Sequence, residues 1–345
     1  EMEEWEEDTD VLLHHLPIVG CAFRKVWRSE TLGRNKSEMV PAKHLVVNNK
    51  CRSLDEAPAV THEVYIYPQD IEERKLSGVW LDLDLQCPAD GDNDDDAPHL
   101  LLEQHCFIDL DEDGYKEPYI VTVHKDSCQV VRIVANFRME DVKDNGKRIV
   151  RIPKEQYFVK YSFIPDPQGG FYDIGFGQLL ESLGETIDTT INQMLDAGHL
   201  QNAGGGFIGT GIRLKKGGQI RVSPGRFEQV ETTGSLKDQV LPHQFPEPSA
   251  VLFQLLGMMV EAAKDITAVK DILTGDTGGQ VQTATTTLAM IEQGLKVFTA
   301  IYKRVYRALK HEFKLLFELN ARHIDEKAYY TFNDQQEVVE KSDYD

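Results

Sequence analysis

The stretch FIDLDEDGYKEPYI alternates three aspartates and places a glycine directly after the third. These residues are Asp109, Asp111, Asp113 and Gly114. They match the first, third, fifth and sixth positions of a calcium-binding loop, in which carboxylate oxygens hold the ion. Such a loop also needs a bidentate glutamate at its twelfth position, where this sequence has Ile120.

The flanks of this stretch, HCFIDL and PYIVTVH, are rich in β-branched and aromatic residues, which is typical of strands. Calcium loops of this kind lie between helices instead. We therefore interpret Asp113-Gly114 as a tight turn between two antiparallel strands, with a bound cation as the alternative. We predict no catalytic residue, no metal site and no cofactor.

Two other groups of residues have side chains that can hold metal. His14 and His15 are adjacent, and neighbouring side chains on a helix diverge by about 100°, so the pair does not easily share one ion. Asp82, Asp84 and the run from Asp92 to Asp96 suit a nuclease with two Mg²⁺ ions only if the carboxylates converge. The run lies in ADGDNDDDAP, which we interpret as a solvated acidic loop. The sequence has no P-loop, G-x-S-x-G or H-E-x-x-H motif.

The composition limits the possible partners. The 345 residues carry 57 acidic and 37 basic side chains, a net charge of -20 at pH 7. Such a surface repels nucleic-acid phosphates, which disfavours tight binding of DNA. The five cysteines are widely spaced and never form a C-x-x-C pair, so we expect reduced thiols. No stretch of about 18 apolar residues is present, so we expect no membrane span.

The N-terminal half of the chain has the pattern of strands and turns after a short helix. The helix is expected in EMEEWEEDTDVLLHHLPI, with Trp5, Val11 and Leu12 inward and Pro17 as its end. LDLDL alternates apolar residues with aspartate, as a strand with one solvated face does. QVVRIVANF predicts another strand, and Asn145-Gly146 predicts a tight turn before RIVRIP. This half is therefore predicted to be an antiparallel β domain.

The pattern becomes helical at GGFYDIGFGQLL. One apolar stripe recurs every fourth residue, at Leu179, Leu183, Ile187, Ile191 and Leu195. Three acidic residues lie away from this stripe, namely Glu181, Glu185 and Asp188. A second helix follows FPEPS, with Pro248 in its first turn. Its predicted inward face consists of Val251, Leu255, Met258, Ala262, Ile266 and Val269.

A third and longer helix is predicted from Ala284 to Asn320. Its apolar seam consists of Leu288, Ile291, Leu295, Phe298, Tyr302, Val305, Leu309, Phe313 and Leu316. Its second face is basic and consists of Lys296, Lys303, Arg307, Lys310 and Lys314. Such a length exceeds the usual globular range, which indicates bundling with other helices or with copies of itself.

Two segments rich in glycine separate the three helices. GGGFIGTGIRLKKGGQIRVSPGRF lacks the spacing of a phosphate-binding loop, and its alternating apolar residues predict small β-hairpins. Its cluster of basic residues includes Arg213, Lys215, Lys216, Arg221 and Arg226. The other segment, LTGDTGGQVQT, is small and polar, and contains Thr274, Gly275, Asp276, Thr277, Gly278, Gly279, Gln280 and Gln282.

This order of elements resembles the portal (head-tail connector) proteins of tailed bacteriophages. The resemblance rests on IPKEQYFVKYSFIPDPQGGFYDIGFGQLLESLGETIDTTINQMLDAG, on LPHQFPEPSAVLFQLLGMMVEAAKDITAVKDILTGDTGG, on TATTTLAMIEQGLKVFTAIYKRVYRALKHEF and on FIDLDEDGYKEPYIVTVH. These stretches cover most of the chain. The resemblance implies an α+β fold with an antiparallel, β-rich wing domain, a helical stem with a small β clip insertion, and one long tunnel helix.

The resemblance also assigns each part of the chain by position. The wing corresponds to residues 1–173, the stem helices to 174–200 and 246–273, the clip to 201–245, the tunnel loop to 274–283 and the tunnel helix to 284–322. Residues 323–345 are expected to return to the wing and to begin a truncated crown.

A portal role implies a homo-oligomeric ring of about a dozen subunits at one capsid vertex. Double-stranded DNA would pass through it during packaging, retention and ejection, without being read for sequence. The implied partners are the terminase large subunit, a tail adaptor or head-completion protein, the major capsid protein and the scaffold. The expected location is the virion, after assembly in the host cytoplasm. We expect no enzymatic activity and no contact with a membrane.

Within that portal, the predicted roles follow from position and charge. The acidic residues of the first stem helix face the channel, the tunnel loop touches DNA, and the basic clip residues dock partners. A net negative subunit prevents tight phosphate contacts, so DNA can slide. Alternatively, the acid is only a solubilising surface.

Two other functions remain as alternatives, a carboxylate nuclease that uses Mg²⁺ and another phage structural or adaptor protein. The native mass separates them, because a ring near a dozen subunits favours the portal. A monomer that cleaves DNA only with divalent ions favours the enzyme.

Overall fold

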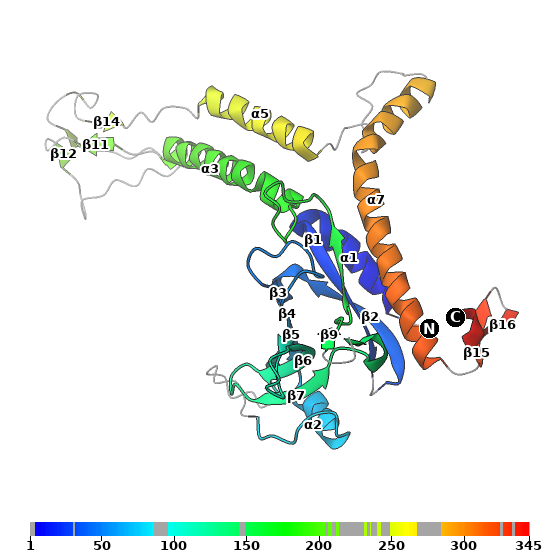
Figure 1. Ribbon diagram of the computed structural model, residues 1–345. Coiled ribbons are helices and arrows are strands. Elements are labelled where there is room, and N and C mark those ends of the chain that lie inside the picture. Colours follow the sequence, from blue (N-terminus) through cyan, green and yellow to red (C-terminus); the bar gives the residue numbers. More distant parts are fainter. Residues whose placement is uncertain are drawn as a thin grey trace. The chain divides into compact units, whose positions relative to one another are not determined.

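A computed structural model describes residues 4–29, 32–85, 96–144, 149–203, 206–208, 212–213, 231–232, 235, 240–242, 249–267, 284–324, 327–332 and 335–344. The chain divides into two compact units (Figure 1). Unit 1 comprises Glu1–Leu179 and Val281–Asp345, and unit 2 comprises Leu180–Gln280. Unit 1 is therefore built from two segments that flank unit 2 in the sequence.

The first segment of unit 1 begins with helix α1 (Trp5–Val19). It continues through β1 (Cys21–Ser29), β2 (Arg34–Pro41), η1 (Ala42–His44), β3 (Leu45–Val47), β4 (Val60–Ile66), α2 (Pro68–Leu76), β5 (His99–Ile108), β6 (Glu117–His124), β7 (Val130–Ala135), η2 (Met139–Asp141), β8 (Lys143–Asp144), β9 (Ile149–Arg151) and β10 (Phe158–Ser162). The second segment holds α7 (Ala284–His323), β15 (Lys327–Phe332), β16 (Gln335–Glu340) and η3 (Lys341–Tyr344).

Two antiparallel sheets organise unit 1. The first has the strand order β10-β1-β2, and the second has the order β3-β4-β5-β6-β7. In the first sheet, Ala22 of β1 lies between Tyr161 of β10 and Pro41 of β2. All strand pairs among the described residues are antiparallel. The prediction of an α+β fold with antiparallel sheets is therefore confirmed.

Both faces of the β10-β1-β2 sheet are buried, because successive strand residues point to opposite sides. Phe23 of β1 contributes to a core that includes Val60 of β4. The neighbouring Ala22 contributes to a separate core, which includes Leu12 of α1 and Ala308 of α7. Strand β1 is thus covered by the second sheet on one side and by two helices on the other.

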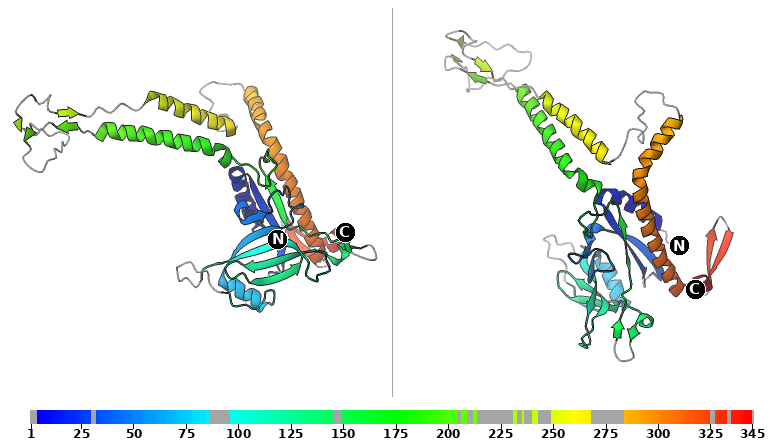
Figure 2. Two further views of the ribbon diagram at one scale, coloured as in Figure 1. Left: turned by 60° about the vertical axis from the view of Figure 1, so that its left-hand side comes forward. Right: turned by 45° about the horizontal axis from the view of Figure 1, so that its top comes forward.

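Helix α2 packs on the five-stranded sheet (Figure 2). Its Ile71 shares a third core with Leu101 of β5 and Val131 of β7. The sequence pattern did not predict α2, although Pro68 at its first turn suits the start of a helix.

The segment LDLDL, predicted as a strand, is not in a strand. The chain turns back over the end of α2, where the Trp80 amide donates to the Arg74 carbonyl at 3.1 Å. Leu83 and Leu85 then pack against the core of α2, whereas Leu81 is exposed. The Leu81 amide donates to the Val131 carbonyl of β7 at 3.0 Å, so the segment runs beside the sheet without forming a regular strand.

Helix α1 differs in two ways from its prediction. Pro17 lies inside the last turn and does not end the helix. The end comes at Gly20, whose φ of 102° is left-handed and whose amide donates to the Leu16 carbonyl at 2.9 Å. Leu12 and Leu16 are buried, but Val11, predicted to face inward, is exposed.

The hairpin of β5 and β6 is confirmed, but its predicted two-residue turn is wrong. Strand β5 ends at Ile108 and β6 begins at Glu117, so eight residues connect them. Positive φ angles occur at Glu112 and Gly114, at 60° and 91°. Strands β8 and β9 also pair, although the Asn-Gly pair predicted to join them lies outside the described residues.

Unit 2 holds most of helix α3 (Phe176–Ala203), β11 (Gly206–Ile208), β12 (Ile212–Arg213), β13 (Glu231–Thr232), β14 (Val240–Pro242) and α5 (Ala250–Thr267). Strand β11 pairs with β14, and β12 pairs with β13. The Gly-rich segment therefore forms short antiparallel pairs where it is described, as predicted.

The expectations of no membrane span and of reduced thiols can be compared with the described residues. No described helix is long and apolar enough to cross a membrane. Four cysteines lie within the described residues and are free: Cys21, Cys51, Cys106 and Cys128. Burial raises the pKa of the Cys21 thiol, and the same cause raises that of Cys106.

Candidate functional site

The basic face predicted on the long helix lies on the surface of α7. Lys303, Arg307, Lys310 and Lys314 are exposed, and the side chain of Lys296 lies outside the described residues. The Lys314 ammonium lies 3.9 Å from the Glu318 carboxylate one turn further on. A row of solvated cations on one helix suits weak, reversible contacts with phosphates.

The apolar seam predicted for α7 is partly wrong. Leu316 is buried, and Val305 and Leu309 are half-buried, but Tyr302 and Phe313 are exposed. The side chains of Leu288, Ile291, Leu295 and Phe298 lie outside the described residues. The buried face instead follows Ala308, Glu312 and Leu316, so a charged residue occupies the middle of the contact with the sheet.

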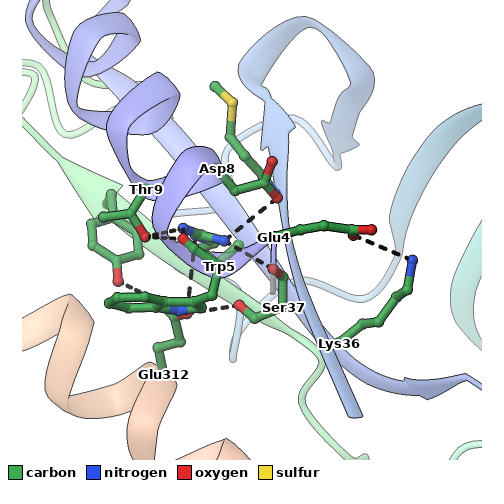
Figure 3. A network of polar contacts seen from close by, with 10 residues as sticks. Glu4, Trp5, Asp8, Thr9, Lys36, Ser37 and Glu312 are labelled. Atoms are coloured by element: carbon green, nitrogen blue, oxygen red, sulfur yellow. Dashed lines mark hydrogen bonds and ion pairs between the residues drawn. The ribbon is translucent and has the colours of Figure 1, made fainter. Parts of the chain in front are cut away.

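Glu312 is fully buried, and its carboxylate accepts three hydrogen bonds from other elements (Figure 3). The Trp5 indole of α1 and the Ser37 hydroxyl of β2 donate to Oε1, each at 2.7 Å. The Tyr161 hydroxyl of β10 donates to Oε2. One carboxylate therefore connects α7 to α1 and to two strands of the first sheet.

The buried cation beside this carboxylate is Arg24 of β1. Its Nε lies 4.0 Å from Glu312, and its side chain is only 1% exposed. The guanidinium also donates to the Ser37 carbonyl at 2.9 Å and to the Trp5 carbonyl at 3.2 Å. Asp8 supplies a second anion at 3.6 Å. The two buried charges thus compensate each other where α1, β1 and α7 meet.

This network was not predicted, although the spacing of residues on α7 contains a signal for it. Glu312 lies four residues after Ala308 and four before Leu316, so it shares one helical face with two buried apolar residues. The pKa of Tyr161 is raised, first by burial and then by the charge of Glu312. The Tyr161 hydroxyl therefore stays protonated and continues to donate.

A second buried cluster connects the two sheets of unit 1. The Lys25 ammonium of β1 lies 2.8 Å from the Glu103 carboxylate of β5, which also lies 3.0 Å from the His105 ring. Burial would raise the pKa of Glu103, but the charge of Lys25 and the bond to His105 outweigh it and lower that pKa. Burial and the Lys25 charge lower the pKa of His62 to about 3. This cluster holds the sheets together and contains no nucleophile with a base.

The three aspartates of the hairpin tip do converge. Each offers one carboxylate oxygen to a group whose members all lie within 4.8 Å of one another. These carboxylates also accept backbone amides of the loop: Oδ2 of Asp109 from Gly114 at 2.9 Å, Oδ1 of Asp111 from Asp113 at 3.3 Å and Oδ1 of Asp113 from Tyr115 at 2.7 Å. These bonds explain the wider turn, because the side chains replace strand pairing.

Glu117 extends this acidic tip into the sheet. It is the first residue of β6, and it is 7% exposed. Its Oε2 is buried and has no hydrogen-bond partner, and the same holds for Oδ1 of Asp109. Burial and the charges of Asp111, Asp113 and Asp109 raise the pKa of Glu117. Sequence reasoning did not single out this residue.

The predicted nuclease residues do not assemble in the same way. Asp82 and Asp84 are exposed, and Asp92 lies outside the described residues. Among the residues that the structure does describe, the tip aspartates are the one carboxylate group compact enough for an ion. His14 and His15 are exposed, and His14 pairs with Asp10 of its own helix at 3.6 Å.

The helices of unit 2 carry their charged residues outward. Glu181, Glu185 and Asp188 of α3 are exposed, and their place in a channel stays a prediction. Its predicted apolar stripe is half-buried at Leu183, Ile187 and Ile191, and exposed at Leu179 and Leu195.

The inward face predicted for α5 is mostly wrong. Of its described members only Ala262 is half-buried, and Val251, Leu255, Met258 and Ile266 are exposed. Leu252, Leu256 and Met259 are half-buried instead. Apolar residues surround most of this helix, so periodicity did not select a face. Pro248 and Val269 lie outside the described residues.

Other predicted site residues fall mostly outside the described residues. Of the basic clip residues, only Arg213 is described, and its backbone lies opposite Glu231 in the pairing of β12 with β13. The structure does not describe Lys215, Lys216, Arg221 or Arg226. It also describes no residue of the predicted tunnel loop.

Comparison with protein families gives a match over most of the chain. The family model described as Phage SU10 portal protein matches residues 19–343. No curated protein matches the sequence. The family match covers both units and nearly the whole chain.

Proposed function

The chain belongs to the Phage SU10 portal protein family, and from this we propose that it forms a ring-shaped DNA channel at one capsid vertex. A phage portal is a structural component of the head-tail connector. The observation that carries the proposal is the match over residues 19–343, which spans both units. We assign the chain to genome packaging, retention and ejection, with the terminase, the tail adaptor and the capsid and scaffold proteins as partners.

Exposed apolar side chains on the helices support assembly from several copies. Phe253 and Met258 of α5 are 71% and 68% exposed, and Tyr302 of α7 is 68% exposed. Large apolar side chains exposed to this degree favour contacts with another protein. In a closed ring each copy would cover such a face on its neighbour, by the same contact repeated around the axis.

The distribution of charge supports passage of DNA without tight binding. The net charge of -20 repels phosphates, while exposed cations such as Lys303 and Arg307 on α7 offer local contacts. The acidic face of α3 is assigned to the channel wall. The tunnel loop of residues 274–283 contains no lysine or arginine, so we assign it to weak contact with the duplex. The basic clip is assigned to docking of acidic partner surfaces.

The first test of this proposal is the native mass of the purified chain. We expect a ring of about a dozen subunits by native mass spectrometry and by single-particle imaging. Met258→Asp should disrupt the ring, because it places a charge in the apolar face of α5. Met139→Asp is the matched control, since Met139 is 82% exposed on unit 1. A wild-type chain that remains monomeric at micromolar concentration contradicts the proposal.

A second test addresses the tunnel loop. Shortening the loop from Gly275 to Gly279 should leave the ring intact and reduce the DNA retained in filled heads several-fold, because a ring of loops would narrow the bore. Replacement of the same five residues by Gly-Ser repeats keeps length and flexibility, and should retain DNA normally. DNA content is measured in purified heads. Normal retention by the shortened chain would exclude this role for the loop.

A further inference from the structure

We propose that His99 and His124 form a pH-sensitive contact, which holds the turn between β6 and β7 in place at neutral pH and releases it in mild acid. This histidine pair lies in the five-stranded sheet of unit 1. The turn consists of residues 125–129, between the end of β6 and the start of β7. The inference does not depend on the ring or on the DNA channel.

The two imidazole rings are buried and contact each other. His99 is the first residue of β5 and is 3% exposed, and His124 is the last residue of β6 and is fully buried. Their ring centroids are 5.1 Å apart, and Nδ1 of His99 lies 3.0 Å from Nε2 of His124. At this distance the two nitrogens form a hydrogen bond, so one of them carries the hydrogen and the other accepts it.

The backbone of the turn determines which nitrogen carries the hydrogen. The Ser127 amide donates to Nδ1 of His124 at 3.3 Å, so this nitrogen is an acceptor. The Ser127 hydroxyl lies 2.8 Å from the same nitrogen and donates to it as well. The neutral His124 ring therefore carries its hydrogen on Nε2 and donates it to His99. One chain of hydrogen bonds thus connects the turn to β5 through both rings.

An additional proton breaks this chain wherever it binds. On Nδ1 of His99 it would point at the hydrogen on Nε2 of His124, and the bond between the rings would be lost. If the His124 hydrogen then moved to Nδ1, the rings would stay bonded but the Ser127 amide would lose its acceptor. A proton that binds directly to Nδ1 of His124 has the same effect on that amide. The complete chain therefore requires two neutral rings.

The residues around the histidine pair favour the neutral rings. Ile66 of β4 lies opposite His99, and Leu101 of β5 lies opposite His124. Burial and the proximity of His124 lower the pKa of His99. Two further charges act on this ring, because Asp126 of the turn favours its protonated form and Lys75 of α2 disfavours it.

The sign of the pH effect follows from this lowered pKa. An unperturbed histidine has a pKa of about 6.5, and the pKa of His99 is lower in the folded chain. Such a group contributes stability that is fully present above pH 6.5 and is lost as the pH falls below it. Two backbone bonds lie at the same place: the Lys125 amide donates to Leu100 at 3.0 Å, and the His124 amide donates to Gln129 at 2.9 Å. Release of the turn therefore exposes these amides to solvent.

The test is hydrogen–deuterium exchange of the full chain at about pH 7.5 and about pH 5, with the rates corrected for the intrinsic effect of pH. We expect the amides of His124 and Lys125 to exchange at least about tenfold faster in acid, which corresponds to about one unit of pKa. The amides of β1 should change by less than about twofold. Equal acceleration in β1 overturns the proposal, because acid would then unfold the whole unit.

Two variants separate the histidine pair from other effects of acid. His99→Gln keeps an oxygen that accepts from Nε2 of His124 but does not titrate, so the acceleration should fall at least about threefold. His99→Gln combined with His124→Gln removes both titrating rings, and its turn should exchange within about twofold at the two pH values. The matched control is His14→Gln, which removes an exposed histidine on α1 and should keep the full acceleration. Acceleration of the wild-type size in the double variant overturns the proposal, as does its loss in His14→Gln.

Discussion

Replacing Glu312 by alanine is expected to lower the free energy of unfolding of unit 1 by about 3–5 kcal/mol. The substitution removes a fully buried carboxylate and leaves the guanidinium of Arg24 with Asp8 as its remaining anion. It also leaves the Trp5 indole and the Tyr161 hydroxyl without their acceptor. Removing one partner of a buried pair costs more than the pair itself contributes.

Tryptophan fluorescence during guanidinium unfolding measures this effect, since all three tryptophans lie in unit 1. The control is Glu73→Ala, which truncates an exposed glutamate on α2 and should change stability by no more than about 0.5 kcal/mol. Protein concentration must be equal in both experiments, because assembly also stabilises the chain. Similar unfolding midpoints for the two variants would show that the Glu312 network contributes little.

Replacing Gly175 by alanine is expected to destabilise unit 1 by about 3 kcal/mol. A Cβ at this position would lie 2.2 Å from the Ile18 carbonyl oxygen and 2.6 Å from the Gly20 amide nitrogen. Both neighbours are backbone atoms at the end of α1, so neither can rotate away. The substitution would separate the start of α3 from α1.

The control for this variant is Gly184→Ala, a glycine further along α3. Apart from the neighbouring backbone of α3 itself, no atom lies within 4 Å of the Cβ that this substitution adds. Alanine also favours helix over glycine by up to about 1 kcal/mol, so this variant should not be destabilised. Unfolding followed by far-UV circular dichroism compares the two variants, because both units contain helices. If Gly175→Ala unfolds at the wild-type midpoint, the close approach of α1 and α3 does not constrain the fold.

The secondary structure that could be predicted was the part with long, regular patterns. The apolar repeat of α7 extends over many turns, and the structure places that helix at Ala284–His323, close to the predicted Ala284–Asn320. The flanking strands of the β5–β6 hairpin were likewise clear from their β-branched residues. Local pattern was weaker for α2, which has only nine residues and one buried side chain, Ile71. A single apolar contact gives no periodicity.

The burial of two acidic side chains, Glu312 and Glu117, could not be predicted from the sequence. Glu312 is buried because Trp5, Ser37 and Tyr161 surround it, and these residues lie up to 307 positions away. No local pattern contains that information. Glu117 is similar, because its burial depends on pairing with Ile108 and on a loop wider than the predicted turn.

Because unit 1 is built from two separated segments, its parts become available for folding at different times during synthesis. Its first segment, Glu1–Leu179, emerges before the whole of unit 2, and α7 follows only afterwards. At usual rates of synthesis the delay before Glu312 appears is on the order of 10 s. Until then Arg24 lacks its buried counterion Glu312, and one face of the β10-β1-β2 sheet is covered by α1 alone. The nascent N-terminal segment is therefore a natural client for chaperones, and folding finishes only when the last long helix is made.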